Sequence, residues 1–273
     1  MSTLQELSNR PSWEWPDDAP RILREALRSG VESAQIQAAE LVGEAEFDDS
    51  LAEAILEILS GSGSPELRAA AAISLGPAIE EADLDRNDSS DEKRALSRPT
   101  LRKIVAKLEE VYRDATQPTV VRRRLLEASV RSPQDWHPDA VRAAWKSGER
   151  EWVATSVFCM GYVKGFDREI VEAMSSTDGS ILQEAVRAAG LAEVTGVERQ
   201  LIDLTASRTA DRDLRLTAIE ALGGAGTDRA TDILYELADS HDSDIAEAAS
   251  EALGMLEGSQ GFDDEDPSDD DAV

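Results

Sequence analysis

The sequence is poor in the residues that build a cross-linked, thick or membrane-embedded core. Its single cysteine, Cys159, excludes an internal disulfide and fits a reducing compartment, so we expect a cytoplasmic protein. Aromatic residues make up only 4% of the chain, and alanine and leucine dominate the apolar set, which favours thin helical layers. No apolar run approaches the ~20 residues that a membrane span needs. The residues from Met1 onward lack the basic and apolar regions of a secretory signal, so none is expected.

Lysine is also scarce, because arginine supplies most of the basic residues. The chain has 56 acidic and 28 basic residues, for a net charge of −28, and seven of the acids lie after Gly261. Excess carboxylate with little lysine suits a salt-rich cytoplasm, in which ions screen the repulsion. We interpret the acidity as adaptation to a halophilic host. The alternative interpretation is a surface for a basic partner.

Six short segments that end in glycine recur along the chain. Their glycines are Gly43, Gly76, Gly161, Gly190, Gly223 and Gly254, and neighbouring ones are separated by 33, 29, 33 and 31 residues where the series is unbroken. Five residues before each glycine stands a small residue, namely Ala38, Ala71, Ser156, Ala185, Ala218 or Ala249. The positions nine, five and one before the glycine share one face of a helix. The pattern therefore predicts helices that approach one another closely at the small residue and that end or loosen at the glycine.

A second apolar stripe lies upstream of several of these helices. Such stripes fall within residues 51–59, 101–111, 197–204 and 233–237. The predicted unit is thus a helix, a turn and a second helix, repeated along the chain.

Two of the turns carry further features of a known repeat. Ser64-Pro65-Glu66-Leu67-Arg68 and Asp211-Arg212-Asp213-Leu214-Arg215 precede segments with paired small residues and a closing Leu-Gly. This pattern resembles the short HEAT repeat, also called PBS-lyase HEAT-like, over roughly residues 20 to 257. The resemblance implies an all-α fold, a right-handed α-solenoid of about seven HEAT-type helix pairs. It indicates little about function, because one fold serves many roles.

The flanking segments and one insertion complete the expected domain organisation. Residues 1–20, with two tryptophans among prolines, are expected to form an N-terminal capping arm for a solenoid over residues 21–257. A wider spacing before the third repeat indicates a flexible acidic insertion at residues 83–99. Residues 258–273 are expected to be a disordered acidic tail.

The sequence offers no convincing catalytic or metal-binding constellation. One class of enzymes built from HEAT repeats, deoxyhypusine hydroxylase, binds iron through paired His-Glu motifs. The two histidines of this chain, His137 and His241, are not followed by Glu. We expect both of them in solvated turns. Cys159 occupies a position where this pattern usually has alanine, so we interpret it as a packed small residue. We therefore predict a protein that is not an enzyme and that needs no cofactor.

The acidic stretch from Asp83 to Arg94 matches a calcium-binding loop at some positions only. Asp83, Asp85, Asn87 and Asp91 match the first, third, fifth and ninth positions of an EF-hand. Asp88 stands where the loop needs glycine, and Arg94 stands where it needs the bidentate glutamate. The stretch is interpreted as a solvated acidic insertion.

Half of the aromatic residues fall within thirty residues of one another, next to a cluster of arginines. Phe158 and Tyr162 are four residues apart and so share a helix face. Because binding surfaces favour Trp, Tyr and Arg, we predict a partner-binding surface on the central repeats that consists of Arg122, Arg123, Arg124, Arg131, Trp136, Trp145, Phe158, Tyr162 and Phe166. The alternative is that the aromatic residues fill gaps in irregular packing and the arginines pair with neighbouring carboxylates.

The function predicted from the sequence is a non-catalytic HEAT scaffold that binds another protein. Two alternatives remain open. The resemblance to phycobilin lyases implies chromophore attachment, for which nothing speaks except the shared repeats. Some HEAT proteins, such as alkylpurine DNA glycosylases, hold DNA in a basic groove, but the acidic body of this chain opposes nucleic-acid binding.

Overall fold

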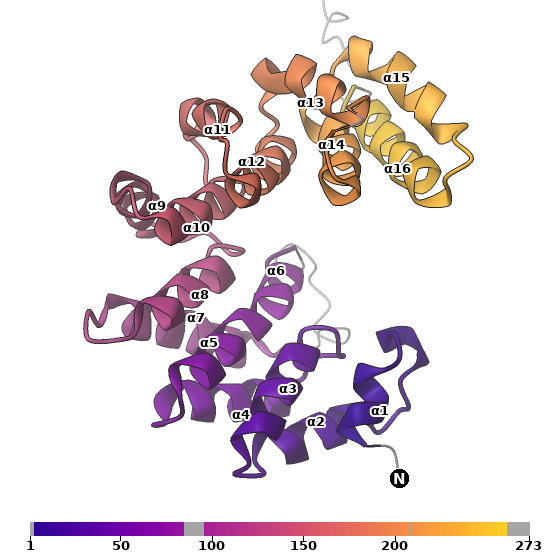
Figure 1. Cartoon of the computed structure of the whole chain (residues 1–273). Coiled ribbons are helices and arrows are strands. Elements are labelled where there is room, and N and C mark those ends of the chain that lie inside the picture. Colours follow the sequence, from indigo (N-terminus) through magenta and orange to yellow (C-terminus); the bar gives the residue numbers. More distant parts are fainter. Residues whose placement is uncertain (1–2, 85–95, 208, 261–273) are drawn as a thin grey trace, which may run out of the picture. The chain divides into compact units, whose positions relative to one another are not determined.

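The structure, a computed structural model, describes residues 3–84, 96–207 and 209–260. These residues form helices joined by turns, with no strand among them (Figure 1). The all-α prediction is therefore confirmed. The chain divides into two compact units, residues 1–140 and 141–273, which are described in turn.

The first unit is built from two sets of helices. It opens with α1 (Leu4–Ser8) and the 3-10 turn η1 (Ser12–Glu14). One set comprises α2 (Ala19–Leu27), α4 (Asp49–Ser60) and α7 (Arg98–Arg113), and the other comprises α3 (Glu32–Val42), α5 (Pro65–Ser74) and α8 (Thr119–Ser129). Helix α5 packs against both α3 and α8, while α2, α4 and α7 pack on α3, α5 and α8, respectively. The short helix α6 (Gly76–Leu84) packs on α5 and α8.

The second unit repeats this plan. Helix α9 (His137–Lys146) crosses the division between the units, and α10 (Arg150–Met160), α12 (Gly179–Leu191), α14 (Arg212–Ala225) and α16 (Ser243–Gln260) follow. From α10 onward, each of these contacts the next. Helices α12, α14 and α16 each also carry an outer helix. Helix α11 (Asp167–Ala173) packs on α12, α13 (Glu198–Thr205) on α14, and α15 (Asp228–Ala238) on α16. The turn η4 (Thr195–Val197) precedes α13. Serial pairing of this kind is the arrangement of an α-solenoid; the number of repeats and the handedness stay predictions.

Successive inner helices meet at small residues, as the spacing predicted. Ala185, Ala218 and Ala249 are fully buried. Gly43 and Gly161 end α3 and α10, as predicted. Gly190 and Gly223 have a different role, because they lie inside α12 and α14 and do not end them. They matter because they have no side chain at a point where the next helix comes close.

Helix starts follow from capping residues, and one of these residues, Asp178, also joins two neighbouring repeats. The Ser64 hydroxyl and the Asp211 carboxylate accept hydrogen bonds from the third residue of their helices, at 3.1 and 2.7 Å. Asp178 caps α12 in the same way and also pairs with Arg150, the first residue of α10. The Arg150 ion pair and the cap hydrogen bonds hold the pKa of the Asp178 carboxyl far below its usual value.

The flanking segments are described in part. Helix α1 packs on α2 and α3, and the proposed role of residues 1–20 as a capping arm stays a prediction. Helix α6 runs to Leu84 and α7 begins at Arg98, so both ends of the expected insertion are helical, and residues 85–95 lie outside the described residues. Helix α16 runs through Gln260, and the rest of the expected tail, 261–273, also lies outside them.

Candidate partner-binding site

The four predicted arginines lie in the first unit and are engaged within the chain. Arg122 donates from Nε to the Tyr112 carbonyl at 3.0 Å, and its guanidinium carbon lies 5.2 Å from the centre of the Tyr112 ring. Arg122 thus supports an aromatic ring on the neighbouring helix.

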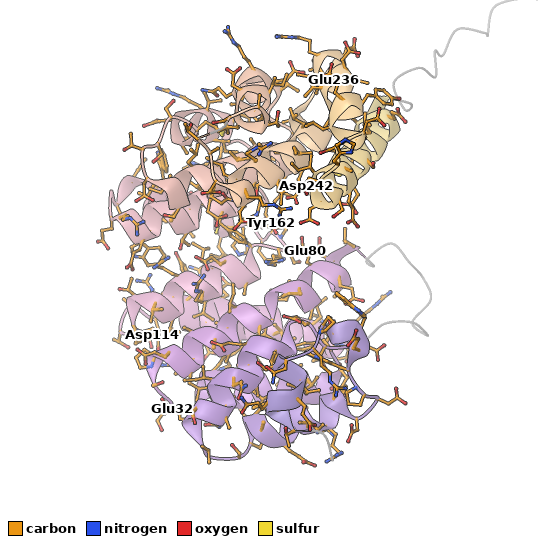
Figure 2. The ribbon with its side chains drawn as sticks, turned by 45° about the vertical axis from the view of Figure 1, so that its right-hand side comes forward. Glu32, Glu80, Asp114, Tyr162, Glu236 and Asp242 are labelled. Atoms are coloured by element: carbon orange, nitrogen blue, oxygen red, sulfur yellow. The ribbon has the colours of Figure 1, made fainter. Side chains whose placement is uncertain are left out.

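The other three arginines pair with carboxylates. Arg124 Nη1 lies 2.5 Å from Oε2 of the buried Glu127, and Arg123 Nη2 lies 4.0 Å from its Oε1. Arg131 pairs with Glu80 of α6, which is labelled in Figure 2. These pairs match the alternative interpretation, in which the arginines neutralise neighbouring acids. The sequence prediction that the whole cluster faces a partner stays a prediction.

Trp136 stands in an aromatic stack that the sequence did not reveal. Its ring centre lies 4.9 Å from that of Tyr112 and 3.9 Å from that of His137, and the Arg113 guanidinium carbon lies 5.9 Å from it. Next to this stack lies a hollow of about 420 Å³. Its lining is Tyr112, Arg113, Asp135, Trp136, Asp139 and Ala140, and we call it the Tyr112–Trp136 hollow.

His137 is fully buried, so the expectation of a solvated turn histidine was wrong. The Gln134 backbone N–H donates to Nδ1 at 2.8 Å, which places the ring proton of the neutral imidazole on Nε2. Nε2 lies 3.0 Å from the Ser129 hydroxyl oxygen and donates to it, and that hydroxyl donates to the Leu126 carbonyl at 3.3 Å. Burial lowers the pKa of His137 to about 4.

This geometry is unsuited to nucleophilic catalysis by Ser129. A general base needs a free lone pair directed at the nucleophile's proton, whereas His137 Nε2 carries a proton toward Ser129. The pair instead joins the end of α8 to the start of α9. His241, by contrast, is exposed in a bend, as expected.

The aromatic residues of the second unit differ from one another in exposure. The rings of Phe158 and Tyr162 are half-buried, with centres 5.5 Å apart, so the two are neighbours (Tyr162 is labelled in Figure 2). They do not share a helix face as predicted, because α10 ends at Met160. Trp145 is also half-buried. Phe166 is only 1% exposed, with the Arg142 guanidinium carbon 5.4 Å from its ring centre, so it belongs to the core and its prediction as a surface contact does not hold.

The remaining predictions concern metal ions, membrane spans and Cys159. Within the described residues, no group of three or more His, Cys, Asp or Glu side chains is placed to hold a metal ion. Of the EF-hand-like positions, Asp83 lies in α6 and accepts a hydrogen bond from the Ser132 hydroxyl at 2.6 Å; the others lie outside the described residues.

None of the described helices has the length and apolar character to cross a membrane. Cys159 is buried, in agreement with its interpretation as a packed small residue.

A comparison with family models supports the repeat assignment for part of the second unit. A family model for HEAT repeats matches residues 168–257, from α11 to near the end of α16. No curated protein matches the chain. Among solved structures, the chain is similar to YibA of Escherichia coli, at 17% identity and a TM-score of 0.44, over 93% of this chain and 85% of that one. It is also similar to human deoxyhypusine hydroxylase in complex with glycerol, at 15% identity and a TM-score of 0.42, over 93% of this chain and 89% of that one.

Proposed function

We propose, from the premise that this chain is a HEAT-repeat protein, that it is a non-catalytic scaffold which binds another protein at the Tyr112–Trp136 hollow. The observation that carries the proposal is the contact of the Tyr112 and Trp136 rings, 4.9 Å apart, beside a hollow of about 420 Å³. Tryptophan, tyrosine and arginine are the residues most enriched among those that dominate binding energy.

The surroundings of the two rings suit this role. Arg122 holds Tyr112 through its carbonyl and its ring face, and the His137 ring centre lies 3.9 Å from that of Trp136. Rings that are already fixed lose little conformational entropy when a partner binds. The exposed Arg113, Asp135 and Asp139 add charges of both signs, as at the polar rim of a protein interface.

The proposed binding surface is smaller than the one predicted from the sequence. Trp136 lies at its centre, and Arg122 supports Tyr112 without contacting the partner itself. Arg123, Arg124 and Arg131 stabilise the first unit through their acidic partners. In the second unit, the half-buried Trp145, Phe158 and Tyr162 remain candidates for partner contact, and Phe166 does not. We also retain the proposal of a cytoplasmic location.

Affinity capture with a charge-reversed rim tests the proposal, and circular dichroism verifies that each variant is folded. The tagged chain, Asp135→Lys and a Tyr112→Ala/Trp136→Ala double variant are each used to capture proteins from cells of the source organism. Tyr235→Ala is the matched control, because Tyr235 is 54% exposed and belongs to α15. We expect proteins captured by the wild type and by the control to be lost from both hollow variants. Equal capture by all four proteins, with helical circular dichroism unchanged, would contradict the proposal.

The same preparations separate the two alternatives that the sequence left open. A pigment that absorbs visible light and co-purifies with the chain would favour chromophore attachment. Retention on a phosphate-bearing resin that falls steeply with salt would favour nucleic-acid binding.

A further inference from the structure

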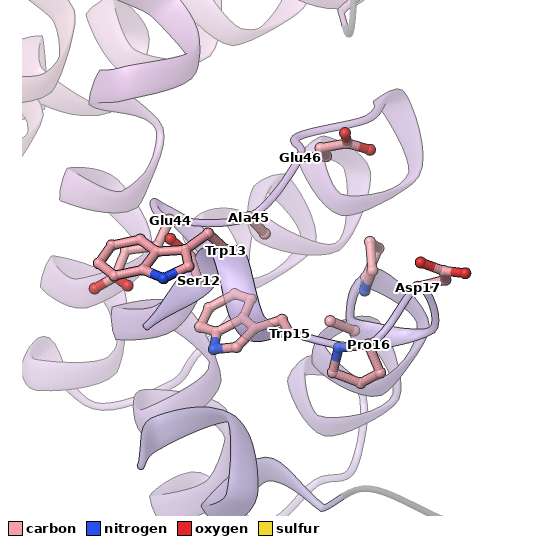
Figure 3. Close-up of a pocket in the computed structure, with 10 residues that line it drawn as sticks. Ser12, Trp13, Trp15, Pro16, Asp17, Glu44, Ala45 and Glu46 are labelled. Carbon is pink, nitrogen blue, oxygen red and sulfur yellow. The ribbon is translucent and has the colours of Figure 1, made fainter. Parts of the chain in front are cut away.

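A second hollow, of about 390 Å³, lies in the first unit between the turn η1 and the segment that joins α3 to α4. Figure 3 shows Trp13 and Glu44 on one side of it, Asp17 and Glu46 on the other, and Ala45 and Trp15 between them. We call it the Trp13 hollow.

The two tryptophans of this segment have opposite roles. The Trp15 indole is half-buried, and its Nε1 donates to the carbonyls of Leu7 and Arg10, both at 3.0 Å. Trp15 therefore anchors the turn. Trp13, two residues earlier, is 84% exposed. Tryptophan is among the more buried residue types on average. Because the turn is anchored by Trp15 and still leaves the Trp13 ring in water, that ring is available to a ligand.

The charges around the Trp13 ring have one sign. Asp17, Glu44 and Glu46 line the hollow and are exposed, and no basic residue is among its lining residues. Within the described part of the chain, none of these three carboxylates forms an ion pair. Their negative potential is therefore not cancelled locally.

We propose that the Trp13 hollow binds a lysine or arginine side chain on a basic segment of a partner polypeptide. The face of an indole attracts a cation through its quadrupole, and the surrounding carboxylates provide a complementary charge and hydrogen-bond acceptors. A purely apolar ligand would remove water from the three carboxylates without offering them hydrogen bonds or an opposite charge. An acidic ligand would be repelled by the same carboxylates. Basic segments are thus the ligands that both the ring and the charges select.

This site is independent of the proposed function. The Trp13 hollow and the Tyr112–Trp136 hollow share no lining residue. Loss of binding at one leaves the other available, so each proposal fails or stands on its own variants.

The test uses short neutral-backbone peptides that differ in one side chain. The probes are Gly-Gly-Arg-Gly-Gly-amide, its lysine form and its glutamate form, each capped at the amino terminus by an uncharged fluorophore and titrated with the full chain. Binding is measured by anisotropy in high salt, which screens the long-range attraction of a chain with net charge −28. The site of contact is read from the indole ¹⁵N–¹H resonances of the five tryptophans, with the Trp13 signal assigned by Trp13→Phe.

We expect the Trp13 resonance to shift saturably with the arginine or lysine peptide and not with the glutamate peptide. Trp13→Ala should weaken binding about tenfold. Glu44→Gln/Glu46→Gln should also weaken it several-fold. The matched control, Glu236→Gln/Glu247→Gln, removes the same charge from exposed positions of the second unit and should leave binding unchanged.

Three outcomes would overturn the proposal. Trp13→Ala could bind the peptides as tightly as the wild type does. The charge control could weaken binding as much as the Glu44/Glu46 variant, which would indicate non-specific attraction. The Trp13 resonance could instead move with protein concentration in the absence of peptide, which would indicate that a second copy of the chain occupies the hollow. Because Trp13 is exposed, its variants should fold, and circular dichroism verifies this.

Discussion

Gly190 in α12 lies against Ala221 in α14 so closely that a Cβ on the glycine would be 2.7 Å from the alanine Cα and 3.0 Å from its Cβ. Real Cβ atoms essentially never come as close as 2.7 Å to another heavy atom, so the neighbouring helix would have to shift. The same arrangement recurs one repeat later, where a Cβ on Gly223 would lie 3.1 Å from the Ala252 Cα in α16. Contact between helix backbones at small residues is therefore what joins one repeat to the next in the second unit.

Gly190→Ala should destabilise the chain. The added methyl group overpacks the α12–α14 contact, at a cost of about 1–3 kcal/mol, which exceeds the gain of up to about 1 kcal/mol from replacing a helical glycine. The matched control is Gly254→Ala, since Gly254 is also helical but has no atom within 4 Å of the added Cβ. The control should be neutral or slightly stabilising in urea unfolding. Equal effects of the two substitutions would be inconsistent with this packing.

His137 should make stability depend on pH. Its pKa is about 4 in the folded chain and 6.5 ordinarily, so between these values the unfolded chain binds more protons. Stability is therefore retained above about pH 6.5 and lost as the pH falls toward 4, by up to about 3 kcal/mol.

Denaturant unfolding of His137→Gln at pH 7 and pH 5 isolates this contribution. The carboxylates titrate in wild type and variant alike, so the difference in pH dependence between the two reports His137. The variant should lose less stability on acidification than the wild type. His241→Gln, at an exposed position, should behave as the wild type does. A His137 variant with the wild-type pH dependence would refute the assignment.

Glu198 should be a stabilising contact between repeats. This buried residue at the start of α13 accepts hydrogen bonds from the Thr227 backbone N–H at 2.8 Å and from its hydroxyl at 2.6 Å, and so caps α15. Glu198→Ala leaves both donors without this acceptor and should cost about 1–3 kcal/mol. Glu236→Ala, on the exposed side of α15, should change stability by no more than about 0.5 kcal/mol. Comparable losses in the two variants would show that the contact contributes nothing specific.

Trp15 and Trp13 should respond differently to the same substitution. Trp15→Phe removes the donor to the Leu7 and Arg10 carbonyls and should destabilise the first unit by about 1 kcal/mol. Trp13→Phe should have no measurable effect on unfolding, because that ring is exposed. If Trp13→Phe were the more destabilising of the two, the roles assigned to these residues would have to be exchanged.

Much of the fold could be predicted from local patterns. Ala185, Ala218 and Ala249 stand at a fixed distance before a glycine, and this regularity identified the inner helices and their close contacts. The sequence placed Asp211 in a turn before an inner helix, and the structure shows that its carboxylate caps that helix. The role of Gly190 was not predicted correctly, because a glycine that ends a helix and one that admits a neighbouring helix look the same in a sequence.

The candidate site could be predicted only in part, because its contacts join distant positions. Trp136 was among the predicted residues, but its partner Tyr112 belongs to α7, whereas Trp136 lies in the turn between α8 and α9, so only the tertiary fold brings the two rings together. Burial of His137 depends on the same tertiary contacts. Phe166 was assigned to the surface because aromatic clustering along the chain does not indicate which ring faces the core.

The most direct test of partner binding is site-specific photocross-linking within the Tyr112–Trp136 hollow. A benzophenone amino acid is placed at Asp135, on the rim of the hollow, or at Glu247, an exposed position in α16, and the chain is irradiated in cells of the source organism. We predict a discrete cross-linked protein from position 135 that is absent from position 247 and that disappears when Trp136→Ala is added. Identical cross-linking from both positions, or cross-linking at position 135 that survives Trp136→Ala, would contradict the assignment of this hollow as the binding site.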